Sequence, residues 1–389
     1  MLLQRTWLGD SEVDLRVAEG VIESIAAPGS LSARSGERTH RGGLITVPIA
    51  EPHVHLDAAL LGARMPNRSG TLREGIANWA VLREQLTAPD VIQRALQTAE
   101  MYAQHGTSRI RTHVDTASLL AVEAMTEVKA QLAQQGITLQ IVAFPQEGVL
   151  RNKGQAEQWE AAVALGCDAV GAIPHFERTT EEGWQSVRMA FDLAEKYDCL
   201  LDFHCDETDD PGSRNLEVVC AETIRRGLQG RVVAGHCTAM HSYPDPYAAK
   251  VIELVAEANV QVITNPLDNV VLQGRYDGYP KRRGITRVDE LWAAGATVGI
   301  GHDSVMDPWY RLGTANLLDP AYMLLHLGHL TSEAEMARIF HVLSGDNHLP
   351  FGGAPPLPAV GKPPHFLWWD QSEPIEILRL RPKPMVVRA

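Results

Sequence analysis

Eight short apolar runs recur through the middle of the chain, and each is followed by a stretch with the spacing of an amphipathic helix. Near-continuous apolar runs of this length are typical of parallel strands that are buried on both faces. We therefore predict strands at Leu44–His55, Ser108–Asp115, Thr138–Pro145, Ala169–Pro174, Leu200–Asp206, Arg231–His236, Gln261–Asn265 and Thr297–His302.

The stretches between these runs predict helices that alternate with the strands. The first, Pro89–His105, begins with proline and stops before Gly106, the usual placing of these residues around a helix. The others lie at Ser118–Gln135, Ala156–Leu165, Glu182–Tyr197, Asn215–Gly227 and Pro246–Ala258, with a final pair near Pro320–His329 and Ser332–Ser344. Eight such repeats indicate an α/β fold whose strands close into a (β/α)8 TIM barrel. The alternative is an open doubly wound sheet, but the first strand lacks the Gly-x-Gly-x-x-Gly of its dinucleotide-binding form.

The two ends of the chain have a different pattern from the middle. Residues 1–43 show short apolar patches separated by turn residues, and the chain becomes rich in proline and glycine after residue 350. Two further apolar runs, Phe366–Asp370 and Ile375–Leu378, predict strands near the C-terminus. We therefore expect residues 1–43 and 350–389 to pair into one small discontinuous β domain beside a barrel of residues 44–349.

Composition and charge limit the possible partners and location. The chain has 389 residues and a net charge of −13, which disfavours a nucleic-acid partner and favours a small neutral or cationic substrate. It lacks a signal-peptide core and any run of eighteen apolar residues, so no membrane association is expected. Its five cysteines are scattered without a Cys-x-x-Cys pair. We therefore expect a reduced, cytoplasmic protein.

Two histidines alternate with a valine at the end of the first predicted strand. In an extended strand, residues two apart share a face, so His53 and His55 would point the same way. Paired neutral imidazoles suit the binding of zinc or ferrous iron. The alternative is a pair of histidines at a hydrated strand end without a metal.

Polar residues also follow most of the other predicted strands. They are His113 and Asp115, Gln146 and Glu147, His175, His204 with Glu207, His236, and His302 with Asp303 and Ser304. In a barrel of this kind, the active site lies at the C-terminal ends of the strands. This placement favours a catalytic site over a chance distribution of polar residues.

The order of these residues resembles the amidohydrolase superfamily, and most closely its bacterial cytosine deaminase branch. The likeness spans roughly residues 45–320. The segments that carry it are Glu51–Asp57, Phe144–Gly148, Gly171–Glu177, His204–Glu207, Pro280–Arg287 and Asp307–Tyr310.

This resemblance implies a role for each residue of the predicted site. The implied ligands of a single divalent metal ion, zinc or Fe(II), are His53, His55, His204 and Asp303. Glu207 would carry a proton, while His236 and Asp303 would orient and deprotonate the attacking water. The residues implied to bind the substrate are Gln146, Leu72, Ser304 and Trp309. The resemblance also implies a homo-oligomer.

The residue types suit the hydrolysis of an aminopyrimidine. A metal ion makes water acidic enough to attack near pH 7, and a nearby carboxylic acid such as Glu207 can protonate the ring and then the departing ammonia. An amide such as that of Gln146 matches a ring edge with one donor and one acceptor. Structural alternatives remain, in which Glu207 and Gln146 are solvated loop residues and Trp309 is part of the core. His113 and Asp115 could either support the metal site or only pack.

Ser304 departs from the cytosine deaminase pattern, in which a second acid directly follows the metal aspartate. A shorter, neutral side chain leaves room for a ring substituent, which makes 5-methylcytosine a candidate substrate beside cytosine. Room for one methyl group changes the discrimination between 5-methylcytosine and cytosine by about 1–3 kcal/mol. We therefore expect an altered preference between these bases within the same reaction class. Three alternatives stay open: an aminohydrolase of isocytosine, creatinine-like or triazine rings such as isopropylammelide, a cyclic amide hydrolase, and a barrel that binds metal only for structure.

Overall fold

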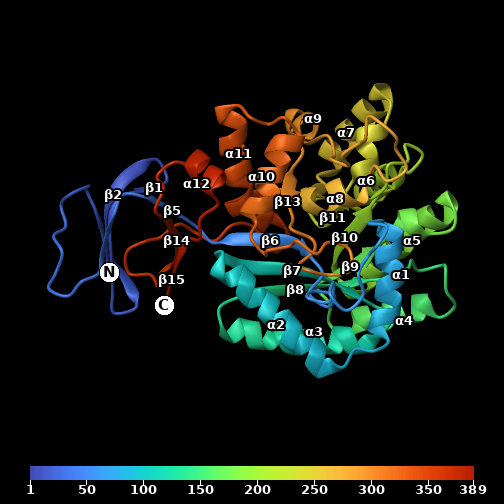
Figure 1. The fold of residues 1–389 in the computed structure, drawn as a ribbon, viewed down its shortest axis with the longest axis horizontal. Coiled ribbons are helices and arrows are strands. Elements are labelled where there is room, and N and C mark those ends of the chain that lie inside the picture. Colours follow the sequence, from blue (N-terminus) through green and yellow to red (C-terminus); the bar gives the residue numbers. More distant parts are fainter.

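The computed structural model describes all 389 residues, and its centre is a sheet of eight parallel strands. Each strand pairs with the next one along the chain, and helices surround the sheet (Figure 1). The strands are β6 (Ile49–Val54), β7 (Thr107–Asp115), β8 (Thr138–Phe144), β9 (Ala169–Ala172), β10 (Leu200–Cys205), β11 (Val232–His236), β12 (Gln261–Thr264) and β13 (Val298–Ile300). Most of their residues are buried, which explains the continuous apolar runs. The predicted barrel is confirmed.

The barrel closes just beyond the C-terminal ends of β6 and β13. The backbone N–H of Asp303 donates to the carbonyl of His53 at 2.9 Å, and the N–H of His55 donates to the carbonyl of Asp303 at 3.2 Å. These bonds form a parallel bridge between Val54 and Asp303. The closure therefore brings together three residues that the sequence placed at opposite ends of the barrel.

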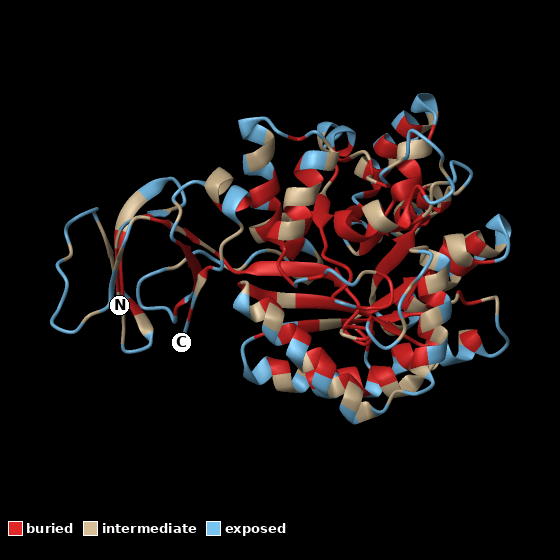
Figure 2. Ribbon diagram, in the orientation of Figure 1, coloured by how far each residue is buried: buried red, intermediate tan, exposed pale blue.

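Helices form the outer layer and turn their apolar faces toward the strands (Figure 2). In α2 (Ala88–Gln104) the buried residues include Val91, Ala95, Ala99 and Tyr102, which follow the period of one helix face. The other outer helices are α3 (Leu119–Gln134), α4 (Gln155–Ala164), α5 (Thr180–Tyr197), α6 (Asn215–Arg226), α7 (Asp245–Ala258), α9 (Val288–Ala293), α10 (Leu318–Leu327) and α11 (Glu333–Ser344). No helix combines the length and the hydropathy that crossing a membrane requires.

Two short helices that the sequence did not predict lie in loops after the strands, at the end of the barrel that carries the site. The first, α1 (Leu72–Arg83), is capped by Thr71, whose hydroxyl accepts from the backbone N–H of Glu74. The second, α8 (Pro266–Leu272), follows β12 directly and begins with a proline. Three 3₁₀ turns complete the connections: η1 (Pro174–Phe176), η2 (Thr238–Ser242) and η3 (Asp346–Phe351).

A second, mixed sheet joins the two ends of the chain, as predicted, and both termini lie in it (Figure 1). Its strands are β1 (Leu2–Leu8), β2 (Ser11–Ala18), β3 (Val21–Ala26), β4 (Thr39–Arg41), β5 (Leu44–Thr46), β14 (His365–Trp369) and β15 (Met385–Arg388). It has its own apolar core of Leu3, Leu15, Ile22, Ile45, Phe366, Trp368 and Val387. This separate core is the physical basis for treating the sheet as a unit beside the barrel.

Two of the predicted strands are wrong in detail. The run Leu44–His55 is not one strand, because β5 pairs with β1 and β14 in the small sheet while β6 begins the barrel at Ile49. Pro48, which has no N–H for a ladder, lies between the two. Residues 44–46 therefore pair outside the barrel to which we had assigned them, and the exact division into domains stays a prediction.

The run Ile375–Leu378 is helical, not extended. It lies in α12 (Pro374–Leu380), which starts with proline and buries Ile377 and Leu378 against the barrel's core. The strand that pairs with β14 is instead β15, which the sequence analysis did not identify.

Candidate active site

Four side chains from three strand ends converge at the C-terminal end of the barrel. His53 lies on β6 and His55 directly follows it, His204 lies on β10, and Asp303 follows β13. The Nε2 atoms of His55 and His204 are 3.1 Å apart. Asp303 Oδ1 lies 3.6 Å from His53 Nε2 and 3.5 Å from His55 Nε2. The four residues predicted as metal ligands are therefore brought together.

The donor atoms fit a divalent metal ion. Ligand atoms around a tetrahedral zinc ion at its usual bond lengths lie about 3.4 Å apart, close to the separations found here. Both ring nitrogens of His53 and Nδ1 of His204 are buried without a hydrogen-bond partner, which is costly unless another group occupies the site. Three imidazoles and one carboxylate are also a ligand set that zinc and ferrous iron both accept.

Close packing around His53 depends on two glycines at neighbouring strand ends. A Cβ atom on Gly235 would lie 2.9 Å from Cε1 of the His53 ring, and one on Gly301 would lie 2.9 Å from the Cβ of His53. Both contacts are closer than real Cβ atoms allow. The glycines therefore leave the space in which His53 stands on the barrel axis.

Burial sets the protonation of these groups. It lowers the pKa of the site histidines His53, His55, His204 and His236 well below the usual value, which favours the neutral imidazole that binds metals. Burial, followed by the charge of nearby Glu207, raises the pKa of the Asp303 carboxyl. Burial likewise raises the pKa of Glu207 well above its usual range.

Glu207 and His236 stand beside the predicted metal ligands. His236 Nδ1 lies 3.6 Å from Glu207 Oε1 and 3.9 Å from Asp303 Oδ2. The amide nitrogen of Asn269 lies 3.0 Å from the same His236 nitrogen and fixes the orientation of the ring. His236 and Asp303 have backbone φ angles of +67° and +68°, a strained region that non-glycine residues rarely adopt. Such strain often occurs at functional sites.

A small inner pocket lies over these side chains. It is lined by His55, Leu72, Gln146, His204, Glu207, His236, Asp268, Leu272, Asp303, Ser304 and Trp309. All the predicted catalytic and substrate-binding residues are in this set. Of the predicted metal ligands, only His53 lies outside it. It is fully buried beneath the pocket.

Asp268 and Leu272 of α8 line the inner pocket, but sequence analysis missed them. The carboxylate oxygen Oδ2 of Asp268 accepts a 2.5 Å hydrogen bond from the Ser304 hydroxyl. The pocket thus has a carboxylate beside Ser304, although position 304 itself carries no acid. A sequence signal was present, because the polar residues Asn265, Asp268 and Asn269 lie at the end of the seventh predicted strand or just beyond it.

A column of buried polar groups continues below the predicted metal ligands. The ring of His113 lies 4.1 Å from that of His53, and its Nε2 is 3.2 Å from Asp202 Oδ1. Asp202 in turn accepts from the Arg111 guanidinium at 2.9 Å. His113 therefore supports the site. Asp115 turns away from it and accepts instead from the indole N–H of Trp79 at 2.8 Å.

His302 also points away from the metal ligands. Its Nε2 accepts from the backbone N–H groups of Thr314 and Ala315, each at 3.2 Å. This orientation follows from the neighbouring Asp303, which points inward.

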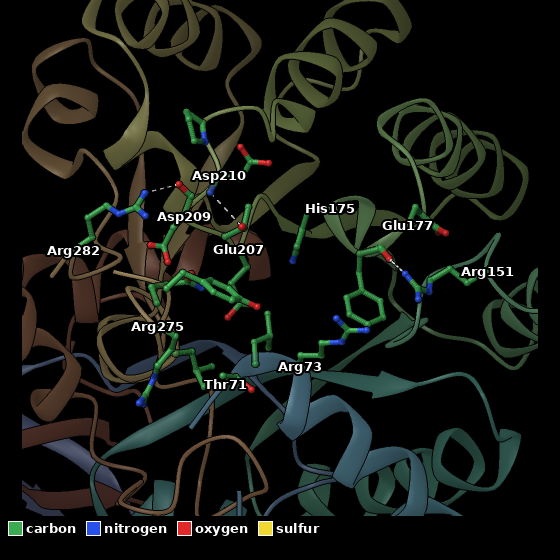
Figure 3. Close-up of a pocket in the computed structure, with 17 residues that line it drawn as sticks. Thr71, Arg73, Arg151, His175, Glu177, Glu207, Asp209, Asp210, Arg275 and Arg282 are labelled. Carbon is green, nitrogen blue, oxygen red and sulfur yellow. Dashed lines mark hydrogen bonds between the residues drawn. The ribbon is translucent and has the colours of Figure 1, made fainter. Parts of the chain in front are cut away.

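The inner pocket adjoins a larger cavity of about 580 Å³, which we call the outer chamber (Figure 3). Leu72, Glu207 and Leu272 line both spaces. His175 and Glu177, which the sequence placed after the fourth strand, line the outer chamber and not the inner pocket.

Comparison with known proteins agrees with this geometry. The model of the amidohydrolase family matches residues 46–354. The solved structure of 5-methylcytosine deaminase from Klebsiella pneumoniae, liganded with 5-fluorocytosine, is 38% identical with a TM-score of 0.92, and the match covers 100% of this chain and 96% of that one. Pterin deaminase from Rhizobium rhizogenes is 30% identical over 82% of this chain and 74% of its own length.

A more distant structure shares the fold alone. N-isopropylammelide isopropylaminohydrolase from Burkholderia multivorans is 23% identical, with a TM-score of 0.80 over 100% of this chain and 96% of that one. Together these matches confirm the resemblance seen in the sequence, and they identify a hydrolase that acts on carbon–nitrogen bonds. Members of this family use a divalent metal, for which the His and Asp cluster of this chain is suited. The chain belongs to the amidohydrolase family.

Proposed function

We propose that this protein is a metal-dependent deaminase of a free pyrimidine base, converting 5-methylcytosine or cytosine to thymine or uracil and ammonia. The observation that carries the proposal is the inner pocket, where Glu207 and His236 stand beside a fitting set of metal ligands. A closed structural metal site would not need such groups at its edge. The 38% identity to a 5-methylcytosine deaminase over the whole chain supports the same reaction.

The proposed metal ligands are His53, His55, His204 and Asp303. One zinc or ferrous ion held by these residues would supply Lewis acidity that lowers the pKa of water to about 7. The buried, neutral imidazoles leave net positive charge at the site, and this charge favours hydroxide over water.

Proton transfer is assigned to Glu207 and its neighbours. Glu207 lines the pocket wall and would donate a proton to the ring nitrogen, then take up the proton of the hydroxyl group added to the ring and pass it to the departing ammonia. His236 and Asp303, whose nearest side-chain atoms are 3.9 Å apart, would orient the attacking water and accept its proton. Asn269 holds the His236 ring in place for this role.

The other pocket residues would hold the ring. Gln146 offers an amide donor and acceptor to the polar edge of the pyrimidine. Trp309 lies near the metal ligands, with its ring centroid 5.8 Å from that of His55, and forms one wall. Leu72 would provide an apolar wall.

Ser304 would set the preference among bases. Its side chain is shorter than the aspartate that follows the metal ligand in the cytosine deaminase pattern, and its hydroxyl is bonded to Asp268. A serine has two heavy atoms fewer than an aspartate, which would leave room for a methyl group on ring carbon five. Because one methyl group is worth about 1–3 kcal/mol in such a pocket, we propose a preference for 5-methylcytosine without loss of cytosine turnover.

A second candidate is the deamination of a larger ring that carries the same amino-pyrimidine edge. The 30% identity to a pterin deaminase favours it, because a pterin contains an isocytosine-like ring fused to a second ring. The outer chamber would provide space for that second ring.

Ammonia release from a panel of bases, measured on metal-loaded protein, separates these functions. The panel contains cytosine, 5-methylcytosine, isocytosine, pterin and creatinine, and N-isopropylammelide is assayed separately for the isopropylamine that its hydrolysis would release. Ammonia from the first two bases supports the proposal, and ammonia from isocytosine or pterin alone supports the second candidate. Ring opening without ammonia would indicate a cyclic amide hydrolase. No reaction with metal bound would indicate a structural metal site.

A further inference from the structure

The outer chamber contains arginines that have no acidic partner. Arg73, Arg151 and Arg275 all line it, and none forms an ion pair with an aspartate or glutamate of the protein. Arg73 lies in the first turn of α1, is exposed, and has no side-chain hydrogen bond. Arg151 is half-buried, and its guanidinium donates to the carbonyl of Phe176 at 2.7 Å and lies 4.6 Å from the centre of that ring.

Four carboxylates also line the chamber, those of Glu177, Glu207, Asp209 and Asp210, and two of them are bound by other groups. Glu177 accepts from the backbone N–H of Val149 at 2.6 Å. Asp209 accepts from the N–H of Gly274 at 2.7 Å and lies 3.3 Å from His241 Nε2. The charge of Arg151 also acts on Glu177, but neither carboxylate forms an ion pair with Arg73, Arg151 or Arg275.

The arginines lie on both sides of the chamber, with Glu177 beside Arg151 and Asp209 near Arg275 (Figure 3). Figure 3 shows Arg73 and Arg151 on one side of the chamber, with Asp209 and Arg282 on the other. Arg282 differs from Arg73 and Arg151 because it is paired with Asp277 at 2.6 Å. The chamber therefore has arginine and acidic side chains in its lining, and Arg73, Arg151 and Arg275 are the arginines that no carboxylate binds in an ion pair.

We propose that the outer chamber binds an anionic group, a carboxylate or a phosphate, carried on a substituent of the substrate ring. Guanidinium groups bind such oxyanions through paired hydrogen bonds, and Arg151 is already held in position by Phe176. Leu72, Glu207 and Leu272 join the chamber to the inner pocket, so a ring in the pocket could extend a substituent into the chamber. This inference rests on the proposed deamination of a ring in the inner pocket.

Matched ligands that differ only in charge test this site. The probes are cytosine-5-acetic acid with its primary amide, and pterin-6-carboxylic acid with its primary amide. Their dissociation constants are measured by titration calorimetry on metal-loaded protein at low and high sodium chloride. We expect the acid of at least one pair to bind about tenfold more tightly than its amide, a preference that salt reduces.

Two variants test whether the arginines cause the tighter binding of the acid. The double variant Arg73→Gln with Arg151→Gln is expected to bind acid and amide equally. Arg68→Gln is the control, because Arg68 lies in the loop just before α1, is exposed, and does not line the chamber. The control is expected to keep the full preference.

The outcomes separate this inference from the proposed function. If neither acid binds more tightly than its amide, or if the double variant keeps the preference, the anion site is overturned. Ammonia release from 5-methylcytosine is measured on the same preparation. A protein that releases ammonia but shows no acid preference overturns only the anion site, whereas one with the preference but without ammonia overturns only the deaminase.

Discussion

Asp303 links the closure of the barrel to the chemistry of the site. Its backbone pairs with His53 and His55, while its carboxylate oxygen lies within 3.6 Å of both rings. The same residue therefore holds two strand ends together and completes the predicted ligand set.

The substitution Asp303→Asn separates these two tasks. The amide keeps the shape and the backbone bonds but lacks the negative charge that a divalent ion requires. We expect a folded barrel that has lost most of its bound metal and its activity. Metal content by plasma mass spectrometry and circular dichroism check this. Asp289→Asn, at an exposed position of α9, is the control and should keep its metal. Full metal content in Asp303→Asn would contradict the assignment.

Glu207→Gln tests the proton carrier. Because the glutamine cannot exchange a proton, kcat should fall by about 10²- to 10⁴-fold while the bound metal is retained. Steady-state kinetics and metal analysis on one sample measure both quantities. The control is Glu157→Gln, on the exposed surface of α4, which should leave both unchanged. A variant with normal kcat would remove Glu207 from the mechanism.

Ser304→Asp tests the choice of base. The longer, charged side chain would occupy the proposed methyl space and repel Asp268, which now accepts the Ser304 hydrogen bond. We expect the ratio of kcat/KM for 5-methylcytosine to that for cytosine to fall by about 10- to 200-fold. A strong cytosine preference in the unchanged protein, together with an unaltered ratio in the variant, would refute the role of Ser304.

The site residues differ in how far sequence could predict them. His53, His55, His204, His236 and Asp303 were found because strands have a period of two and barrels place their sites at strand ends. Asp268 was missed because it lies on a seven-residue helix, where neither strand nor helix period gives a signal. Its contact with Ser304 joins two loops and can be found only from the fold.

At the scale of elements, the barrel strands were predictable and short segments were not. Strands that are buried on both faces leave continuous apolar runs, so all eight were located from sequence, including the short β9, β12 and β13. The run Ile375–Leu378 is too short to distinguish an alternating strand from one helical turn, and tertiary packing against the core decides in favour of α12. At Leu44–His55, two strands of different sheets follow one another with only two residues between them.

An ion pair in the small sheet gives this element its own pH dependence. Arg16 of β2 holds Glu37 through bonds of 2.9 and 3.1 Å, and this contact lowers the pKa of Glu37 to about 2. Because the pKa of Glu37 is lower in the folded state, the ion pair stabilises the fold at pH values above the ordinary pKa of 4.5. This stabilisation is lost as the pH falls toward 2.

Glu37→Gln should therefore destabilise the protein at neutral pH. We expect a lower urea midpoint than that of the unchanged protein at pH 7, with a difference that narrows as the pH falls below about 4.5. The control Glu19→Gln, at an exposed turn of the same sheet, should have nearly the same urea midpoint as the unchanged protein at any pH. If the difference in urea midpoint between Glu37→Gln and the unchanged protein stays constant with pH, the ion pair is not the cause of that difference.

At the scale of the whole molecule, net charge is a poor guide to the site. The charge of −13 predicted a neutral or cationic substrate, yet the outer chamber gathers arginines without acidic partners. Composition reports the sum of all charges, whereas a ligand responds to those within about a Debye length, roughly 8–10 Å. The homo-oligomer stays a prediction, which sedimentation of the purified protein can check.

The central claim is that water replaces the amino group of a pyrimidine base. The most direct measurement incubates metal-loaded protein with 5-methylcytosine in water enriched in oxygen-18, then analyses the product by mass spectrometry and the ammonia by enzymatic assay. We predict thymine with one labelled oxygen, one equivalent of ammonia, and no product after removal of the metal by a chelator. Unlabelled thymine, a ring-opened product, or full activity without metal would contradict the account.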